Sequence, residues 1–190
     1  MEALATKLTY LFISWTNKEY SNEDIEIYDY GFQCFLNSIT TDLILLFWGL
    51  ITHSLLETIC WLITFCIYRH HAGGAHASTS IRCIILSSLL GISNYAILRF
   101  ADYIIPLIMP IYIISLIICI LFAPIQSKKY LSPLERKREK IISAAIISLS
   151  IIASHFVSNS ISISISYSLF IANILIVIAT FKDKNRVSNY

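Results

Sequence analysis

Three histidines and a cysteine lie between two long apolar segments, in the stretch RHHAGGAHASTSIRC that runs from Arg69 to Cys83. A cysteine thiolate is a strong nucleophile, and a nearby histidine can accept its proton and later return one to a leaving amine. Cys83 and His76 are therefore candidates for a catalytic nucleophile and its general base. The residue types predict covalent acyl transfer of the kind that cysteine proteases perform.

The surroundings of Cys83 favour this chemistry. We expect Cys83 in the opening turns of a helix, where unpaired backbone amides and the neighbouring Arg82 favour a thiolate. Along one continuous helix His76 would lie about 10 Å from Cys83, too far for a hydrogen bond. A sharp turn at Gly73 and Gly74 would let the imidazole fold back over the helix start. The alternative that stays open is a packed thiol and an ordinary loop histidine.

No metal or cofactor is expected at this stretch. His70, His71 and His76 are not accompanied by a thiolate or carboxylate pattern typical of a metal site. The sequence has no CxxC, and most of its other cysteines lie in apolar runs, where a cysteine is usually a small buried hydrophobe. We therefore expect no disulfide framework among the five cysteines.

The composition indicates a membrane protein. Of the 190 residues 56% are hydrophobic and 14% are charged, and the mean hydropathy is +0.70; soluble domains carry about a quarter charged residues. Apolar runs of about 20 residues, each long enough to cross a bilayer as a helix, recur along the chain. We predict an all-α, single-domain integral-membrane protein with an amphipathic interfacial helix at residues 1–16 and six transmembrane helices. Their expected ranges are 31–51, 54–68, 80–98, 104–122, 141–157 and 163–181.

Three local features qualify this scheme. Ser21 or Asn22 is a plausible N-cap for the first long helix, and Pro106 and Pro110 predict a kink in the fourth. Residues 158–168 alternate serine and isoleucine with the period of a strand. Because a lone strand in lipid would leave its backbone groups unpaired, we predict a helical hairpin there, with the serines at the turn and facing neighbouring helices.

The basic residues predict the orientation. With six spans, all lysines and arginines except Arg99 fall on one side, thirteen of the fourteen. The positive-inside rule then places both termini, the Arg69 to Cys83 stretch and the basic segment 123–140, expected to be a loop, in the cytoplasm of a cell-membrane protein. Because these basic residues cluster between apolar runs, we expect the lipid bilayer and not a nucleic acid as their surroundings.

The chain resembles the accessory gene regulator B (AgrB) family of Gram-positive bacteria. The resemblance rests on RHHAGGAHASTSIRC, on APIQSKKYLSPLERKREK from Ala123 to Lys140, and on YGFQCF from Tyr30 to Phe35, in that order. Members are membrane cysteine endopeptidases that cut the C-terminal part from a small quorum-sensing propeptide and close the new end into a thiolactone. The resemblance implies that Cys83 is the nucleophile and His76 its base, with Arg69 and Gly74 supporting the site.

A third catalytic group is expected at the depth of Cys83. If the first span starts in the cytoplasm, Gln33 lies near that depth, whereas Asp42 lies near mid-membrane and Glu57 in the outer half of its span. Gln33 is therefore the candidate for an oxyanion donor or for the group that orients His76. A structural role in bonding neighbouring helices is the alternative.

The basic segment has two interpretations. It could serve only topology and contact with anionic headgroups, or it could dock an acidic part of the propeptide. The candidate docking residues are Lys128, Lys129, Arg136, Lys137, Arg138 and Lys140.

Two other functions remain open. One is a peptide exporter with Asp42, Glu57 and His155 along its path, although we see no internal repeat of the kind such proteins often carry. The other is a non-catalytic membrane sensor. A homodimer would give the polar faces of the first spans a partner.

Overall fold

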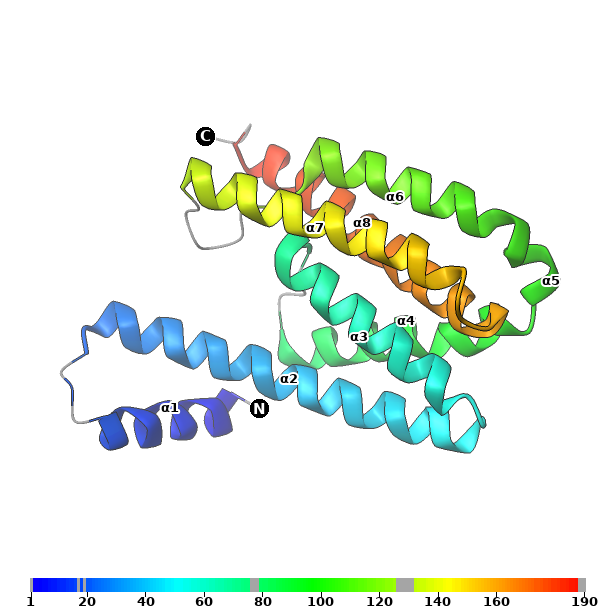
Figure 1. The fold of residues 1–190 in the computed structure, drawn as a ribbon. Coiled ribbons are helices and arrows are strands. Elements are labelled where there is room, and N and C mark those ends of the chain that lie inside the picture. Colours follow the sequence, from blue (N-terminus) through cyan, green and yellow to red (C-terminus); the bar gives the residue numbers. More distant parts are fainter. Residues whose placement is uncertain (1, 17, 19, 76–78, 126–131, 188–190) are drawn as a thin grey trace.

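The computed structural model describes residues 2–16, 18, 20–75, 79–125 and 132–187, and the regular structure in these ranges is helical (Figure 1). This confirms the all-α prediction for the described part of the chain. The helices are α1 (Glu2–Thr16), α2 (Asn22–Ile51), α3 (Leu55–Ala72), α4 (Ser80–Leu98), α5 (Ala101–Ile104), the 3-10 helix η1 (Ile105–Leu107), α6 (Ile108–Phe122), α7 (Pro133–Ser154) and α8 (Asn159–Val187).

The start of α2 is fixed by a capping box. The Ser21 hydroxyl accepts a hydrogen bond from the Asp24 N–H at 3.2 Å, and the Asp24 carboxylate accepts one from the Ser21 N–H at 3.1 Å. Such reciprocal bonds satisfy backbone donors that a helix start leaves unpaired. Of the two predicted candidates, Ser21 is therefore the N-cap, and α2 begins well before the expected span at residue 31.

The start of α7 corrects the prediction of a loop over residues 123–140. Ser132 and Glu135 form a second capping box, and Pro133 occupies the first turn, where its missing N–H costs nothing. The helix therefore begins at Pro133, and its first two turns carry Arg136, Lys137 and Arg138. The sequence SPLE held this signal within a segment that its charge made look like a loop.

Helix α8 is the centre of the bundle, and it packs against α3, α4, α6 and α7. The turn before it confirms the predicted hairpin; Ser158 lies at that turn, as expected, but the other serines of the stretch lie inside α8. Because this part of α8 is buried on nearly all sides, a two-residue alternation carries no information about its faces. The serines at positions 162, 164, 166 and 168 are all buried.

Four segments in the described part of the chain are long and apolar enough to cross a membrane: α2, α4, the run Ala101–Phe122 and Asn159–Lys182 of α8. They match four of the six predicted spans. The other two correspond to α3, which carries Glu57 and Arg69, and to α7, whose first turns are charged. Their crossing of the bilayer stays a prediction. The expected kink appears as η1, which contains Pro106.

Helix α1 packs along the first half of α2 (Figure 1). Ala5 and Thr9 are buried in this contact, whereas Leu4, Leu11 and Trp15 are 49%, 51% and 81% exposed. An apolar face of this kind suits the membrane interface. The interfacial position of residues 1–16 nevertheless remains a prediction.

One end of the bundle collects the segments on which the candidate chemistry depends. Figure 1 shows the ends of α3 and α6 and the starts of α4 and α7 on the same side. A buried polar contact holds α3 to α8 there: the Tyr68 hydroxyl donates to Asn173 Oδ1 at 2.9 Å, and Asn173 Nδ2 donates to the Leu169 carbonyl at 2.8 Å. This contact fixes α3 one residue before Arg69.

Candidate active site

A glycine turn, Gly73 and Gly74, ends α3. The Gly73 N–H donates to the Arg69 carbonyl at 3.0 Å, and the φ angles of the two glycines are +79° and +148°. L-residues rarely adopt such values, whereas glycine adopts them without steric cost. At Gly73 a Cβ would also lie 3.0 Å from the Ile125 carbonyl oxygen. The sharp turn predicted before His76 is present.

Two backbone hydrogen bonds hold this turn against the bundle. The Ala75 N–H donates to the Leu175 carbonyl of α8 at 3.0 Å, and the Ile125 N–H donates to the Ala72 carbonyl at 3.1 Å. The chain is therefore fixed up to Ala75, directly before His76. His76 itself lies outside the described residues.

Cys83 lies at the start of α4, as predicted. Thr79 is the N-cap: its side chain accepts from the Arg82 N–H at 3.4 Å, and its carbonyl accepts from the Cys83 N–H at 3.0 Å. Cys83 is thus the fourth residue of the helix, and its own amide is paired. Its side chain is half-buried and contributes to the wall of a cavity.

Arg69 connects the two halves of the site. Its guanidinium carbon lies 5.6 Å from the centroid of the Phe65 ring, and its Nη2 donates to the Ala75 carbonyl. A Cβ added at Gly74 would lie 3.3 Å from Arg69 Nε. Gly74 therefore allows the guanidinium group to pack against the turn, a physical reason for a supporting role of both residues.

The positive charge of Arg69 reaches several thiols. It lies close enough to the Cys83, Cys66 and Cys34 thiols, and to the Tyr30 hydroxyl, to interact with them electrostatically. Arg69 Nε is buried and has no hydrogen-bond partner among the described groups. A buried cation beside the candidate nucleophile can stabilise negative charge that develops there during a reaction.

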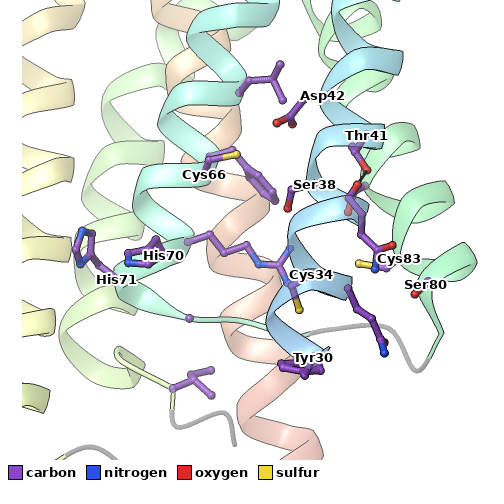
Figure 2. Close-up of a pocket in the computed structure, with 18 of the residues that line it drawn as sticks. Tyr30, Cys34, Ser38, Thr41, Asp42, Cys66, His70, His71, Ser80 and Cys83 are labelled. Atoms are coloured by element: carbon purple, nitrogen blue, oxygen red, sulfur yellow. Dashed lines mark hydrogen bonds between the residues drawn. The ribbon is translucent and has the colours of Figure 1, made fainter. Parts of the chain in front are cut away.

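The cavity has a volume of about 960 Å³ and lies between α2, α3, α4 and the start of α7. Figure 2 shows Cys34, Ser38 and Asp42 on α2 facing Cys66 of α3, with Cys83 on α4 beside them. Pockets of about 300–1,000 Å³ are typical of ligand sites. The arrangement can bind an elongated ligand beside the thiols of Cys34, Cys66 and Cys83.

The proposed third groups are placed differently from one another. Gln33 lines the cavity with Cys83, and its Nε2 donates to Asp29 Oδ2 at 2.7 Å. Asp42 lines the same cavity further along α2. Glu57 and His155 are not among the described residues that line the cavity. The structure therefore does not bring together the three residues of the exporter hypothesis.

Glu139 connects the basic start of α7 to the end of α3 at the site. His71 Nδ1 lies 2.5 Å from Glu139 Oε2, and Arg138 Nη2 lies 2.9 Å from Glu139 Oε1. These hydrogen bonds, that of His71 first, hold the pKa of Glu139 below its usual value. The end of α3 is thus tied to the start of α7.

The other candidate docking residues divide into two groups. Arg136, Lys137 and Arg138 are exposed, and Lys140 is half-buried. Lys128 and Lys129 lie outside the described residues.

Among the residues that the structure describes, no three His, Cys, Asp or Glu side chains cluster as a metal site would need.

Sequence reasoning missed three residues of this site. Tyr30 and Cys34 lie close enough to Arg69 to interact with it electrostatically. The YGFQCF stretch contains both residues, but nothing in their spacing pointed to Arg69. Glu139 was also missed, although it is one of only two acidic residues in the basic segment.

Comparisons with known proteins all point to the same family. A family model described as "Accessory gene regulator B" matches residues 5–181. AgrB-like protein 2 of Clostridium perfringens strain 13 is 27% identical over 64% of this chain and 60% of its own length. An AgrB-like protein of strain SM101 is 26% identical over 79% of this chain and 72% of its own length.

A third relative is the accessory gene regulator protein B of Staphylococcus saprophyticus, which is 29% identical over 63% of each chain. The chain therefore spans less than two thirds of the length of two of these three relatives. No solved structure matches the chain.

Proposed function

Because this chain belongs to the accessory gene regulator B family, we propose that it is a membrane-embedded cysteine endopeptidase that cleaves a small quorum-sensing propeptide. Family membership implies a part in processing such a peptide. The observation that carries the enzymatic proposal is the position of Cys83. Its thiol lies in the wall of the cavity, within electrostatic reach of Arg69 and on the helix that follows the glycine turn.

The proposed reaction begins with attack of the Cys83 thiolate on a peptide carbonyl near the C-terminal region of the propeptide. A carbon–sulfur bond forms, the carbon–nitrogen bond breaks, and His76 gives the thiol proton to the departing amine. Arg69 would stabilise the negative charge that develops at the reacting centre. The acyl half remains bound to Cys83 as a thioester.

The thioester keeps enough free energy for a second acyl transfer. A thiol or hydroxyl within the bound peptide attacks the thioester carbonyl, the Cys83 thiolate leaves, and a thiolactone or lactone ring closes. Holding both groups in one cavity raises their effective concentration, and excluding water prevents simple hydrolysis. No metal or cofactor takes part in the proposed mechanism.

Processing by single variants tests this proposal. Wild-type protein and the Cys83→Ala and His76→Ala variants are reconstituted in liposomes with a precursor peptide, and the cleaved products are measured by mass spectrometry. We expect both variants to lose cleavage, whereas Cys60→Ala, which removes an α3 thiol outside the cavity lining, should cleave normally. Normal cleavage by Cys83→Ala would overturn the enzymatic proposal.

We propose Gln33 as an oxyanion donor or as the group that orients His76. Its position in the cavity wall with Cys83 supports this role. Gln33→Ala should lower kcat about tenfold, or about 1.4 kcal/mol of transition-state stabilisation, without changing the melting temperature. Cleavage at the wild-type rate would remove Gln33 from the mechanism.

We also propose that the exposed start of α7 docks an acidic segment of the propeptide. Arg136 and Lys137 support this best, because both are exposed whereas Arg138 is paired with Glu139. The double substitution Arg136→Glu and Lys137→Glu should raise KM for an acidic precursor and leave kcat unchanged. A precursor whose acidic residues are amidated should show no difference between variant and wild type.

The proposed location is the cell membrane, with both termini and Cys83 on the cytoplasmic side. The uneven distribution of lysine and arginine supports this orientation. Labelling of engineered cysteines in intact cells with a membrane-impermeant maleimide tests it. A cysteine at Tyr103 should react from outside, and one at Arg136 should react only after the cells are opened.

A further inference from the structure

The cavity beside Cys83 continues along one face of α2. A polar row lines it at positions i, i+3, i+4, i+7 and i+8, namely Cys34, Asn37, Ser38, Thr41 and Asp42. That spacing places the row on a single face of the helix. Figure 2 shows its labelled members succeeding one another along α2, with Asp42 about two turns beyond Cys34.

The other side of α2 is apolar. Ile39, Leu43 and Phe47 are 40%, 63% and 66% exposed, as expected of a surface that meets lipid. α2 is also one of the segments able to cross a membrane. A polar row inside such a helix is costly unless the side chains find partners.

Besides Arg69 Nε, two further polar atoms of cavity-lining residues have no such partner. Asn37 Oδ1 and Trp61 Nε1 are both buried without a hydrogen bond to any described group. Trp61, which lines the cavity from α3, is only 1% exposed. Two residues of the cavity wall therefore carry an unused acceptor and an unused donor, and the Asp42 carboxylate adds acceptors further along.

We propose that the polar row and Trp61 form the binding subsite for the peptide segment on the acyl side of the cleaved bond. This inference rests on the proposed function. An extended peptide presents both N–H donors and C=O acceptors, which match Asn37 and Trp61. From Cys34 to Asp42 the row spans about 12 Å along the helix axis. That length accommodates about four extended residues.

The two ends of the cavity differ in charge, and we infer from this difference which half of the substrate lies at each end. Near α7 the wall includes Glu135, Arg138 and Glu139, which lie at the charged end of the bundle. The amine half, released first, departs there. The acyl half stays attached to Cys83 and occupies the polar row, where surrounding helices keep the thioester away from bulk water until the ring closes.

Peptide binding in the absence of chemistry tests this subsite. All measurements use the Cys83→Ala protein in detergent, so that no thioester forms. The probe is the fluorescein-labelled precursor peptide that this protein binds most tightly in a panel of autoinducer precursors. The probe is therefore chosen by binding and not by cleavage. If the proposed chemistry is wrong, the Cys83→Ala protein will still cleave the precursor, and that result is distinct from a loss of binding.

Two substitutions should weaken binding at least tenfold. Asn37→Leu removes the unpaired acceptor and keeps a side chain branched at Cγ, and Ser38→Phe fills the cavity. The matched control for the bulky change is Ile39→Phe, which adds a ring on the exposed side of the same helix and should bind within twofold of the parent. Wild-type affinity in both Asn37→Leu and Ser38→Phe would overturn the subsite.

Half-length peptides then test the assigned side. A peptide that ends at the cleaved position should lose affinity in Asn37→Leu, whereas a peptide that begins after it should bind equally to both proteins. Loss for the second peptide alone would overturn the assignment of the acyl side. Because Asn37→Leu is the smaller change and faces the cavity wall, it keeps the test valid even if Ser38→Phe does not fold.

Discussion

Gly74 packs directly against Arg69, so closely that a Cβ at Gly74 would lie 3.3 Å from Arg69 Nε. The two residues are separated by the end of α3, and the turn between them brings the backbone onto the guanidinium group. The same guanidinium donates to the Ala75 carbonyl and interacts with Cys83. The glycine turn and the charge beside the candidate nucleophile therefore form one structural unit.

Replacing Gly74 should disturb both the glycine turn and the position of the Arg69 charge beside Cys83. Gly74→Ala introduces a side chain at φ +148° and beside Arg69, which we expect to destabilise the fold by about 1–2 kcal/mol. Cleavage should fall further than this loss of stability explains, because Arg69 is displaced from Cys83. Thermal unfolding and single-turnover cleavage measure the two effects.

The matched control is Gly31→Ala. Gly31 lies in α2, and a Cβ there would have no atom within 4 Å. Alanine is a better helix former than glycine, so this variant should be as stable as the parent or slightly more stable. Equal behaviour of Gly74→Ala and Gly31→Ala would contradict the contact between Gly74 and Arg69.

The shape of the Arg69 side chain should matter as well as its charge. A lysine keeps the charge but lacks the planar group that stacks on Phe65 while donating to Ala75. We expect Arg69→Lys to lower kcat about tenfold, which corresponds to about 1.4 kcal/mol. Arg99 also lies over an aromatic ring, 5.0 Å from the centroid of Tyr95, but on the opposite end of the bundle. Arg99→Lys should therefore leave kcat unchanged, and an equal loss in both variants would indicate a general effect of the substitution.

The parts of this site that the sequence could predict are those with local causes. The Ser21 cap, the glycine turn and the position of Cys83 in the first turns of a helix depend on neighbouring residues, and the sequence predicted them. The Thr79 and Ser132 caps are equally local but were not predicted, the second because the surrounding charge obscured it. The pairing of His71 with Glu139 joins residues 68 positions apart, and no local pattern specifies it. The polar row of α2 is intermediate: its helical spacing was visible in the sequence, but its partner Trp61 depends on how α2 and α3 pack.

The contact between α3 and α7 should depend on pH. Hydrogen bonds from His71 and Arg138 hold the pKa of Glu139 below its usual value of 4.5. A carboxyl group whose pKa is lower in the folded state stabilises the fold above its unfolded pKa, and this stabilisation disappears as the pH falls through the folded value. The stabilising effect should therefore be complete at pH 7 and should decline below about pH 4.5.

Melting temperatures of the wild type and Glu139→Gln, measured from pH 7 to pH 3.5, test this dependence. We expect the two proteins to differ at pH 7 and to converge at the acidic end. The control is Glu23→Gln, which changes an exposed carboxyl group in the first turn of α2. A constant difference between wild type and Glu139→Gln over the whole range would show that the ionisation of Glu139 does not support the contact.

The central claim is that Cys83 carries the acyl half of the peptide, and acid-quenched mass spectrometry tests it most directly. Wild-type protein mixed with precursor and quenched within the first turnover should gain the mass of the acyl half on the tryptic peptide that contains Cys83. Hydroxylamine should release this mass, as expected of a thioester, and Cys83→Ala should show no adduct. Cleavage without an adduct at Cys83, or an adduct on another cysteine, would contradict the account.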